Sequence, residues 1–107
     1  MTSPRPDIDK LLRSAIEQKR LIRLHYQDKD RTIEPHDYGI KNGSVKLLAY
    51  QIKGSSSTRL PSWKWLEVDQ ISNAQALDQH FRGGRGASGE KHHNWDELFI
   101  RVKPADE

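Results

Sequence analysis

Cysteine is absent from the 107 residues of this chain. Without thiols the chain cannot form disulfides, thiolate zinc sites or cysteine nucleophiles. No apolar run approaches the ~20 residues that cross a bilayer, and the first ten residues lack the charged and then apolar pattern of a secretion signal. From these absences we expect a cytoplasmic protein with no membrane partner.

The sequence also lacks the short motifs of common enzymes. It contains no GxSxG, no glycine loop of the phosphate-cradling type and no paired catalytic carboxylates. Ser55, Ser56 and Ser57 lie in a glycine- and serine-rich stretch without an evident base nearby. We therefore expect a protein that is not an enzyme and that carries no cofactor.

Apolar residues make up only 34% of the chain and charged residues 31%, which predicts one small domain with a compact core. The net charge of +3 favours anionic partners, but only modestly.

An amphipathic helix is predicted over residues 7–19. Its apolar residues recur at the i, i+3, i+4, i+7, i+8 spacing of one helix face: Ile8, Leu11, Leu12, Ala15 and Ile16. Pro6 stands just ahead of this stretch, and Asp7 is a plausible N-cap.

From Arg20 onward the apolar pattern changes to a period of 2, which indicates strands. Residues 21–27 place Ile22, Leu24 and Tyr26 on one face. Residues 31–40 continue as a strand that is bent or at an edge, because Pro35 cannot donate to a ladder. Asn42-Gly43 is a strong signal for a tight hairpin turn.

Three further strand segments follow. Residues 44–53 are apolar on both faces, which predicts a central strand. Residues 54–62 are predicted to form a flexible loop. Residues 61–71 and 72–81 supply the last two strands, and Leu66 and Val68 form the core face of the first of these. About five short antiparallel strands after one helix favour a small closed barrel or a strongly bent sheet.

The remaining segments predict the domain organisation. We assign residues 1–81 to the barrel with its leading helix, residues 82–91 to a linker that contains the sequence RGGRG, and residues 92–107 to a C-terminal clasp that packs on the barrel. Residues 94–103 fit a helix capped by Asn94 and fit a strand equally well.

Trp63 and Trp65 are two residues apart, so in a strand their rings point to the same face. Because Leu66 and Val68 already supply the core face, we expect Trp65 to be covered and Trp63 to be partly exposed. A partly exposed indole can stack on a base, with Lys64 and Arg59 adding phosphate contacts. The alternative is that both rings belong to the core or lie under the clasp.

Basic side chains form a second candidate set: Arg31, His36, Lys46, Arg59 and Lys64. The hairpin at Asn42-Gly43 joins the strands of Arg31 and Lys46, which predicts that these two side chains are neighbours. The alternative is an ordinary solvated surface, with Arg31 paired to Glu34 or Glu67.

His92 and His93 form i, i+4 pairs with Asp96 and Glu97 if the segment is helical, as metal ligands often do. The spacing is not that of HExxH, and we expect these residues to begin a helix and to bind no metal.

Parts of the chain resemble the WYL domain, an SH3-like (Sm-like) barrel of bacterial transcriptional regulators. The resemblance spans roughly residues 8–81 and rests on matches to the family's Arg-x-x-Glu-Pro, central-strand and Asp-Arg-Ile elements: Arg31, Glu34, Pro35, Leu47, Ala49, Asp69 and Ile71. Val45 and Lys46 stand where the family has Trp and Tyr, while Glu67 and Gln70 replace two arginines. No helix-turn-helix precedes the barrel, so the resemblance implies a diverged, stand-alone sensor module.

The sequence thus predicts a mainly β (α+β) SH3-like barrel and a non-catalytic, regulatory module that senses a single-stranded nucleic acid or a nucleotide-like anion. The predicted ligand-binding residues are Arg31, His36, Lys46, Arg59, Trp63 and Lys64. The alternative function is a protein-interaction or oligomerisation module, such as a homodimer, with no nucleic-acid ligand.

Overall fold

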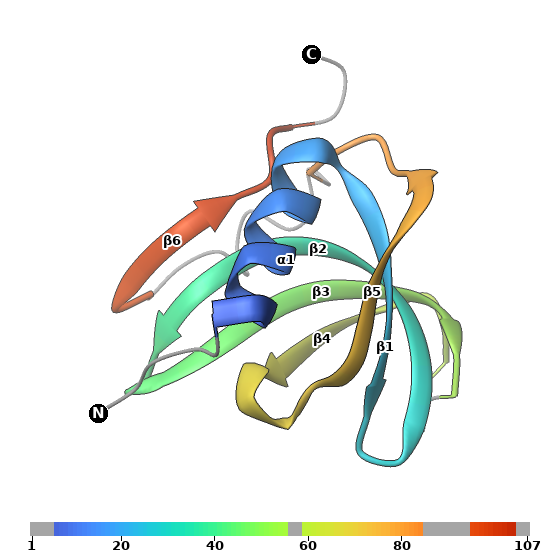
Figure 1. Ribbon diagram of the computed structural model, residues 1–107, viewed down its shortest axis with the longest axis horizontal. Helices are drawn as coiled ribbons and strands as arrows, with labels where there is room; N and C mark the ends of the chain where they lie inside the picture. Colours follow the sequence, from blue (N-terminus) through green and yellow to red (C-terminus); the bar gives the residue numbers. More distant parts are fainter. Residues whose placement is uncertain (1–5, 56–58, 85–94, 105–107) are drawn as a thin grey trace.

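The computed structural model describes residues 6–55, 59–84 and 95–104. In these ranges the chain forms one α-helix, one short 3-10 helix and one antiparallel sheet (Figure 1). The elements are α1 (Pro6–Gln18), β1 (Arg20–Tyr26), β2 (Lys29–Lys41), β3 (Ser44–Gly54), β4 (Ser62–Glu67), the 3-10 helix η1 (Val68–Gln70), β5 (Ser72–His80) and β6 (Glu97–Arg101). The predicted mainly β fold with one leading helix is confirmed.

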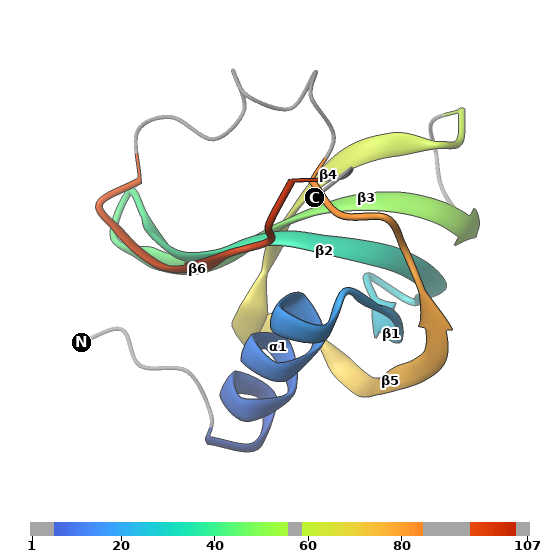
Figure 2. The same ribbon diagram turned by 90° about the horizontal axis from the view of Figure 1, so that it is seen from above.

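Helix α1 covers one face of the sheet, as the view from above shows (Figure 2). Four of the five residues of its predicted apolar stripe are buried, and the fifth, Leu11, is half-buried. The helix already begins at Pro6, a residue that suits the first turn because no donor is needed there. The prediction that Asp7 caps the helix is therefore wrong: Asp7 lies in the first turn, where its charge suits the positive helix end.

Strands β1 to β4 form a meander with two tight turns. The turn between β2 and β3 has positive φ at Asn42 (53°) and Gly43 (80°), which confirms the hairpin predicted there. Gln27 and Asp28 form the turn between β1 and β2, also with positive φ. Both turns hold neighbouring strands in antiparallel register.

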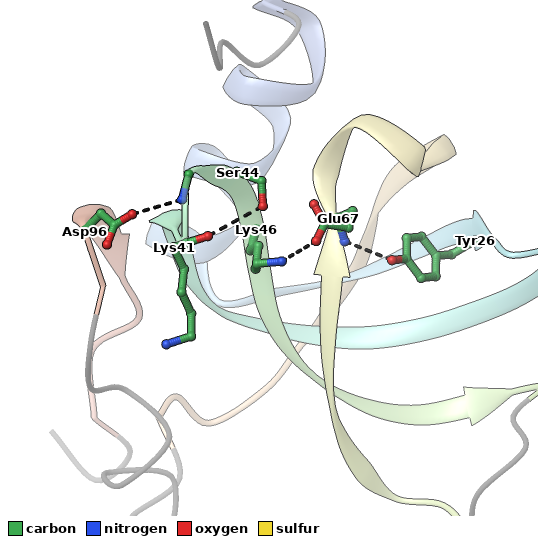
Figure 3. Close-up of polar contacts among 7 residues, drawn as sticks. Tyr26, Lys41, Ser44, Lys46, Glu67 and Asp96 are labelled. Carbon is green, nitrogen blue, oxygen red and sulfur yellow. Dashed lines mark hydrogen bonds and ion pairs between the residues drawn. The ribbon is translucent and has the colours of Figure 1, made fainter.

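Strand β5 returns to β1, so the strand order is β4-β3-β2-β1-β5. Among the described residues β4 and β5 do not pair, and the sheet is bent but not closed into the predicted barrel. A side chain bridges the bent sheet instead: the hydroxyl of Tyr26 on β1 accepts a hydrogen bond from the backbone N–H of Glu67 on β4, at 2.9 Å (Figure 3).

Pro35 lies in the middle of β2, which is a central strand and not an edge. Two features of β2 accommodate the missing N–H. The pairing with β1 ends at Ile33 and the pairing with β6 begins at Asp37, and the register with β3 shifts between Pro35 and Asp37. The bent strand that the sequence allowed at Pro35 is thus found, at an irregularity where a proline costs little.

The strand register divides the sheet into two faces. The face under α1, here called the inner face, carries Ile22, Leu24, Ile33, Leu47 and Leu66, each at most 1% exposed. The outer face of β2, β3 and β4 carries Asp37, Leu48, Tyr50, Trp63 and Trp65. The predicted core positions Leu66 and Val68 are both buried, which leaves the tryptophans of β4 on the outer face.

Strand β6 pairs antiparallel with the second half of β2. Residues 97–101 therefore form a strand. The predicted helix start at Asp96 and Glu97 is wrong, because this segment forms backbone hydrogen bonds with β2. The N–H of Val102, just after β6, donates to the carbonyl of His36 at 2.8 Å. Asn94 and most of the predicted linker, residues 85–91, lie outside the described residues.

Candidate functional site

The six predicted ligand-binding residues do not form one site. Trp63 and Lys64 are neighbours in β4, so their side chains point to opposite faces of the sheet. Lys64 shares the inner face with Leu66, whereas Trp63 shares the outer face with Tyr50. Arg59 is exposed in the loop before β4. The prediction that Lys64 assists stacking on Trp63 is wrong for this geometric reason.

Arg31 lies on the inner face and is only 5% exposed. One of its terminal nitrogens donates to Oε1 of Gln51 at 3.0 Å, and its guanidinium carbon lies 5.5 Å from the ring centroid of Tyr26. The expected alternatives, a pairing of Arg31 with Glu34 or Glu67, are not seen among the described residues. Arg31 is instead held by a neutral amide and an aromatic face.

Arg31 and Lys46 are not neighbours, contrary to the prediction. In the register of the β2–β3 hairpin, Arg31 lies opposite Gly54 and Lys46 lies opposite Gly39. These positions are roughly 25 Å apart along β2 at ~3.3 Å per residue. A hairpin brings together only residues that are equidistant from its turn, and Arg31 is far from the turn while Lys46 is close to it.

Lys46 forms an ion pair with Glu67, its cross-strand partner on β4 (Figure 3). The hydrogen bond from Lys46 holds the pKa of Glu67 below its ordinary value, against the opposing effect of burial. Glu67 thus neutralises Lys46. In the resemblance to WYL domains, Glu67 replaces an arginine and Lys46 replaces a tyrosine. Lys46 is not available to an anion in this geometry.

His36 is fully buried and does not face solvent as a ligand-binding residue would. Its ring meets the ring of Trp63 edge-on at 4.8 Å and lies 5.5 Å from that of Phe81. Nδ1 lies 2.9 Å from the carbonyl oxygen of Glu34. His36 therefore supports Trp63, which also meets Tyr50 at 5.0 Å.

Trp65 was expected to be covered, yet it is 37% exposed, whereas Trp63 is half-buried as predicted. The ring of Trp65 lies 5.4 Å from that of Trp95, at an interplanar angle of 49°. The ammonium of Lys41 lies 5.4 Å from the centroid of Trp65. We call Lys41, Trp65 and Trp95 the indole surface.

The sequence analysis did not identify Lys41 or Trp95 as site residues. Trp95 is held by Asp37, a fully buried carboxylate that accepts from the indole N–H at 3.2 Å and from Arg101 in two hydrogen bonds. Gly39 makes room for this arrangement, because a Cβ there would lie 2.3 Å from the carbonyl oxygen of Glu97. A glycine inside a long strand is the one sequence signal that indicates such a close approach.

The described residues contain no group of three or more His, Asp or Glu side chains that could hold a metal ion. His92 and His93 lie outside the described residues, so the structure says nothing of them. In the described ranges no helix is long and apolar enough to cross a membrane.

No protein-family model, no curated protein and no solved structure matches this chain. The resemblance to WYL domains therefore stays a prediction.

Proposed function

We propose that this chain is a non-catalytic binding module for a nucleic acid or a nucleotide-like anion, and that the ligand binds at the indole surface. The observation that carries the proposal is the exposed ring of Trp65, placed beside Trp95 and close to the ammonium of Lys41. The resemblance to WYL domains supports a role as a sensor in bacterial, cytoplasmic regulation.

The physical basis is the combination of a ring face with a positive charge. Any nucleobase can stack on an indole, with a gain of about 1–3 kcal/mol per base. Lys41 adds attraction for the phosphate that follows the base. This contribution weakens as the salt concentration rises, because releasing condensed counterions from the nucleic acid then gains less free energy. Stacking without base-edge contacts implies a ligand of low sequence specificity.

Binding of short labelled single-stranded DNA and RNA, followed by fluorescence anisotropy, tests the proposal. We expect Trp65→Ala to weaken binding by about tenfold, which corresponds to ~1.4 kcal/mol. Leu98→Ala is a matched control, because Leu98 is an aliphatic residue with the same 37% exposure. Equal affinity of the wild type and Trp65→Ala would rule out the indole surface as the binding site.

A second function, protein interaction, is favoured by a different observation. Trp65 and Leu98 are the exposed large apolar residues of the described chain, and the register places both on the outer face. Such a pair could anchor a protein partner or a second copy of the chain. In that case Leu98→Ala would weaken association as Trp65→Ala does, and raising the salt concentration would change the affinity little.

A further inference from the structure

A group of cations lies on the inner face, at the end of the sheet remote from the Asn42-Gly43 turn. Arg31 lies in this region on β2, and Lys64 lies on the same face of β4. Lys64 is opposite Ala49, one position along that face from Gln51, the residue that binds Arg31. Diagonal neighbours of this kind lie about 7–8 Å apart, within the reach of long side chains.

The charges in this region repel one another. Burial is the main cause that lowers the pKa of Lys64, followed by the positive charges of Arg31 and then Lys29. Among the described residues no carboxylate forms an ion pair with Arg31. A cation that is 95% buried beside other cations is costly for a fold, and such a group usually has a carboxylate partner or a ligand.

The hydrogen-bonding capacity of Arg31 is only partly used. Nε of Arg31 is buried and makes no hydrogen bond with any described residue. The amide of Gln51 is fixed in orientation, because its nitrogen donates to the carbonyl oxygens of Lys53 and Ser55, at 3.1 and 3.0 Å. Its oxygen accepts from a terminal nitrogen of Arg31 and not from Nε. These bonds direct only the Oε1 atom of Gln51 at the guanidinium.

The geometry points to a phosphate-binding site formed by Arg31 and Lys64, in which Gln51 and Tyr26 hold the guanidinium in place. Nε of Arg31 donates to one phosphate oxygen, and the ammonium of Lys64 supplies a second charge. A phosphate group fits better than a carboxylate, because its two negative charges match more than one cation. This site is on the opposite face of the sheet from the indole surface and does not depend on it.

Inorganic phosphate, titrated at constant ionic strength, is the direct probe. The readout is the ¹H–¹⁵N signal of the Arg31 Nε–H group, assigned by its absence from Arg31→Lys. We expect a saturable shift of this signal, and AMP should produce the same shift if the site accepts phosphate esters. A signal that does not move with phosphate overturns the inference.

Lys64→Met is the decisive variant. Lys10→Met, at an exposed position of α1, is the matched loss of one lysine. Lys64→Met should weaken phosphate binding by about tenfold, since it removes one of the two direct charges. Equal weakening by Lys10→Met would show nonspecific attraction and would overturn the site.

Trp65→Ala separates this inference from the proposed function. It should leave the response of Arg31 to phosphate unchanged while it weakens oligonucleotide binding. Loss of the phosphate response in Trp65→Ala would contradict two separate sites.

Discussion

Leu47 and Leu48 are adjacent in β3 and both fully buried, yet they lie in different surroundings. Leu47 belongs to the continuous aliphatic core of the inner face, which packs against α1. Leu48 lies on the outer face, paired in register with Trp65 and with the buried carboxylate Asp37. Equal burial therefore does not mean equal environment: one face is a folding core, and the other supports an exposed aromatic surface.

The two faces also differ in how they treat cations. On the outer face Lys46 is paired with Glu67, and Arg101 is paired with Asp37. On the inner face the positive charge of Arg31 helps to lower the pKa of Lys64, and no ion pair is described between Arg31 and a carboxylate. The face on which a cation lies, more than its neighbours in the sequence, decides whether an anion can use it.

The largest expected effect comes from truncating the core leucine. Leu47→Ala should lower the free energy of unfolding by about 3–5 kcal/mol, because the cavity forms in a closely packed core. Leu48→Ala should cost about 2 kcal/mol, since the smaller outer cluster is freer to collapse around the lost volume. Chemical denaturation of both variants measures the difference. Equal losses would mean that the outer face is a second folding core.

A smaller effect is expected where β6 meets β2. Gly39→Ala places a Cβ 2.3 Å from a backbone oxygen of β6 and 3.1 Å from the ring of Trp95, so β6 must shift. We expect a loss of about 2–3 kcal/mol and a changed fluorescence of Trp95. Gly43→Ala is the control: its Cβ meets nothing within 4 Å, and only the positive φ opposes it, at about 1 kcal/mol. An unchanged fluorescence in Gly39→Ala would contradict the role of Gly39 in seating Trp95.

The smallest expected effect is the pH dependence of the Lys46–Glu67 pair. Because the folded protein lowers the pKa of Glu67, the pair stabilises the fold above the ordinary glutamate pKa, and this contribution is lost as the pH falls through the lowered value. Since the Glu67 side chain is 34% exposed, we expect no more than about 1 kcal/mol. Thermal unfolding between neutral and acidic pH should show a shallower pH dependence for Glu67→Gln than for the wild type. An identical dependence in both would show that the pair contributes nothing.

Local patterns in the sequence predict the elements well, because their causes are local. The helical stripe from Ile8 to Ile16 and the Asn42-Gly43 turn are found where the spacing and the backbone preference place them. The alternation that buries Leu66 also predicts that Lys64 points inward and Trp63 outward. That alternation was sufficient to separate Lys64 from Trp63, although composition suggested a single basic and aromatic site.

The candidate sites could not be predicted in the same way, since their residues meet only through long-range pairing. Trp95 reaches Trp65 because β6 pairs with β2, and no spacing in the sequence encodes that pairing. Lys46 lies opposite Glu67 in the β3–β4 register, and the two form an ion pair. The sequence alone predicted Lys46 as a ligand-binding residue, because the pairing partner of its strand was unknown.

The sequence by itself determined where α1, the strands β1 to β5 and the Asn42-Gly43 turn lie, because the hydrophobic period and left-handed turn residues act over a few positions. Only the tertiary structure decided that the sheet remains open among its described strands, that Trp65 is exposed, and that Arg31 and Lys64 share one face of the sheet. The physical reason is that exposure and charge neutralisation depend on which strands pair and on which face each side chain then lies.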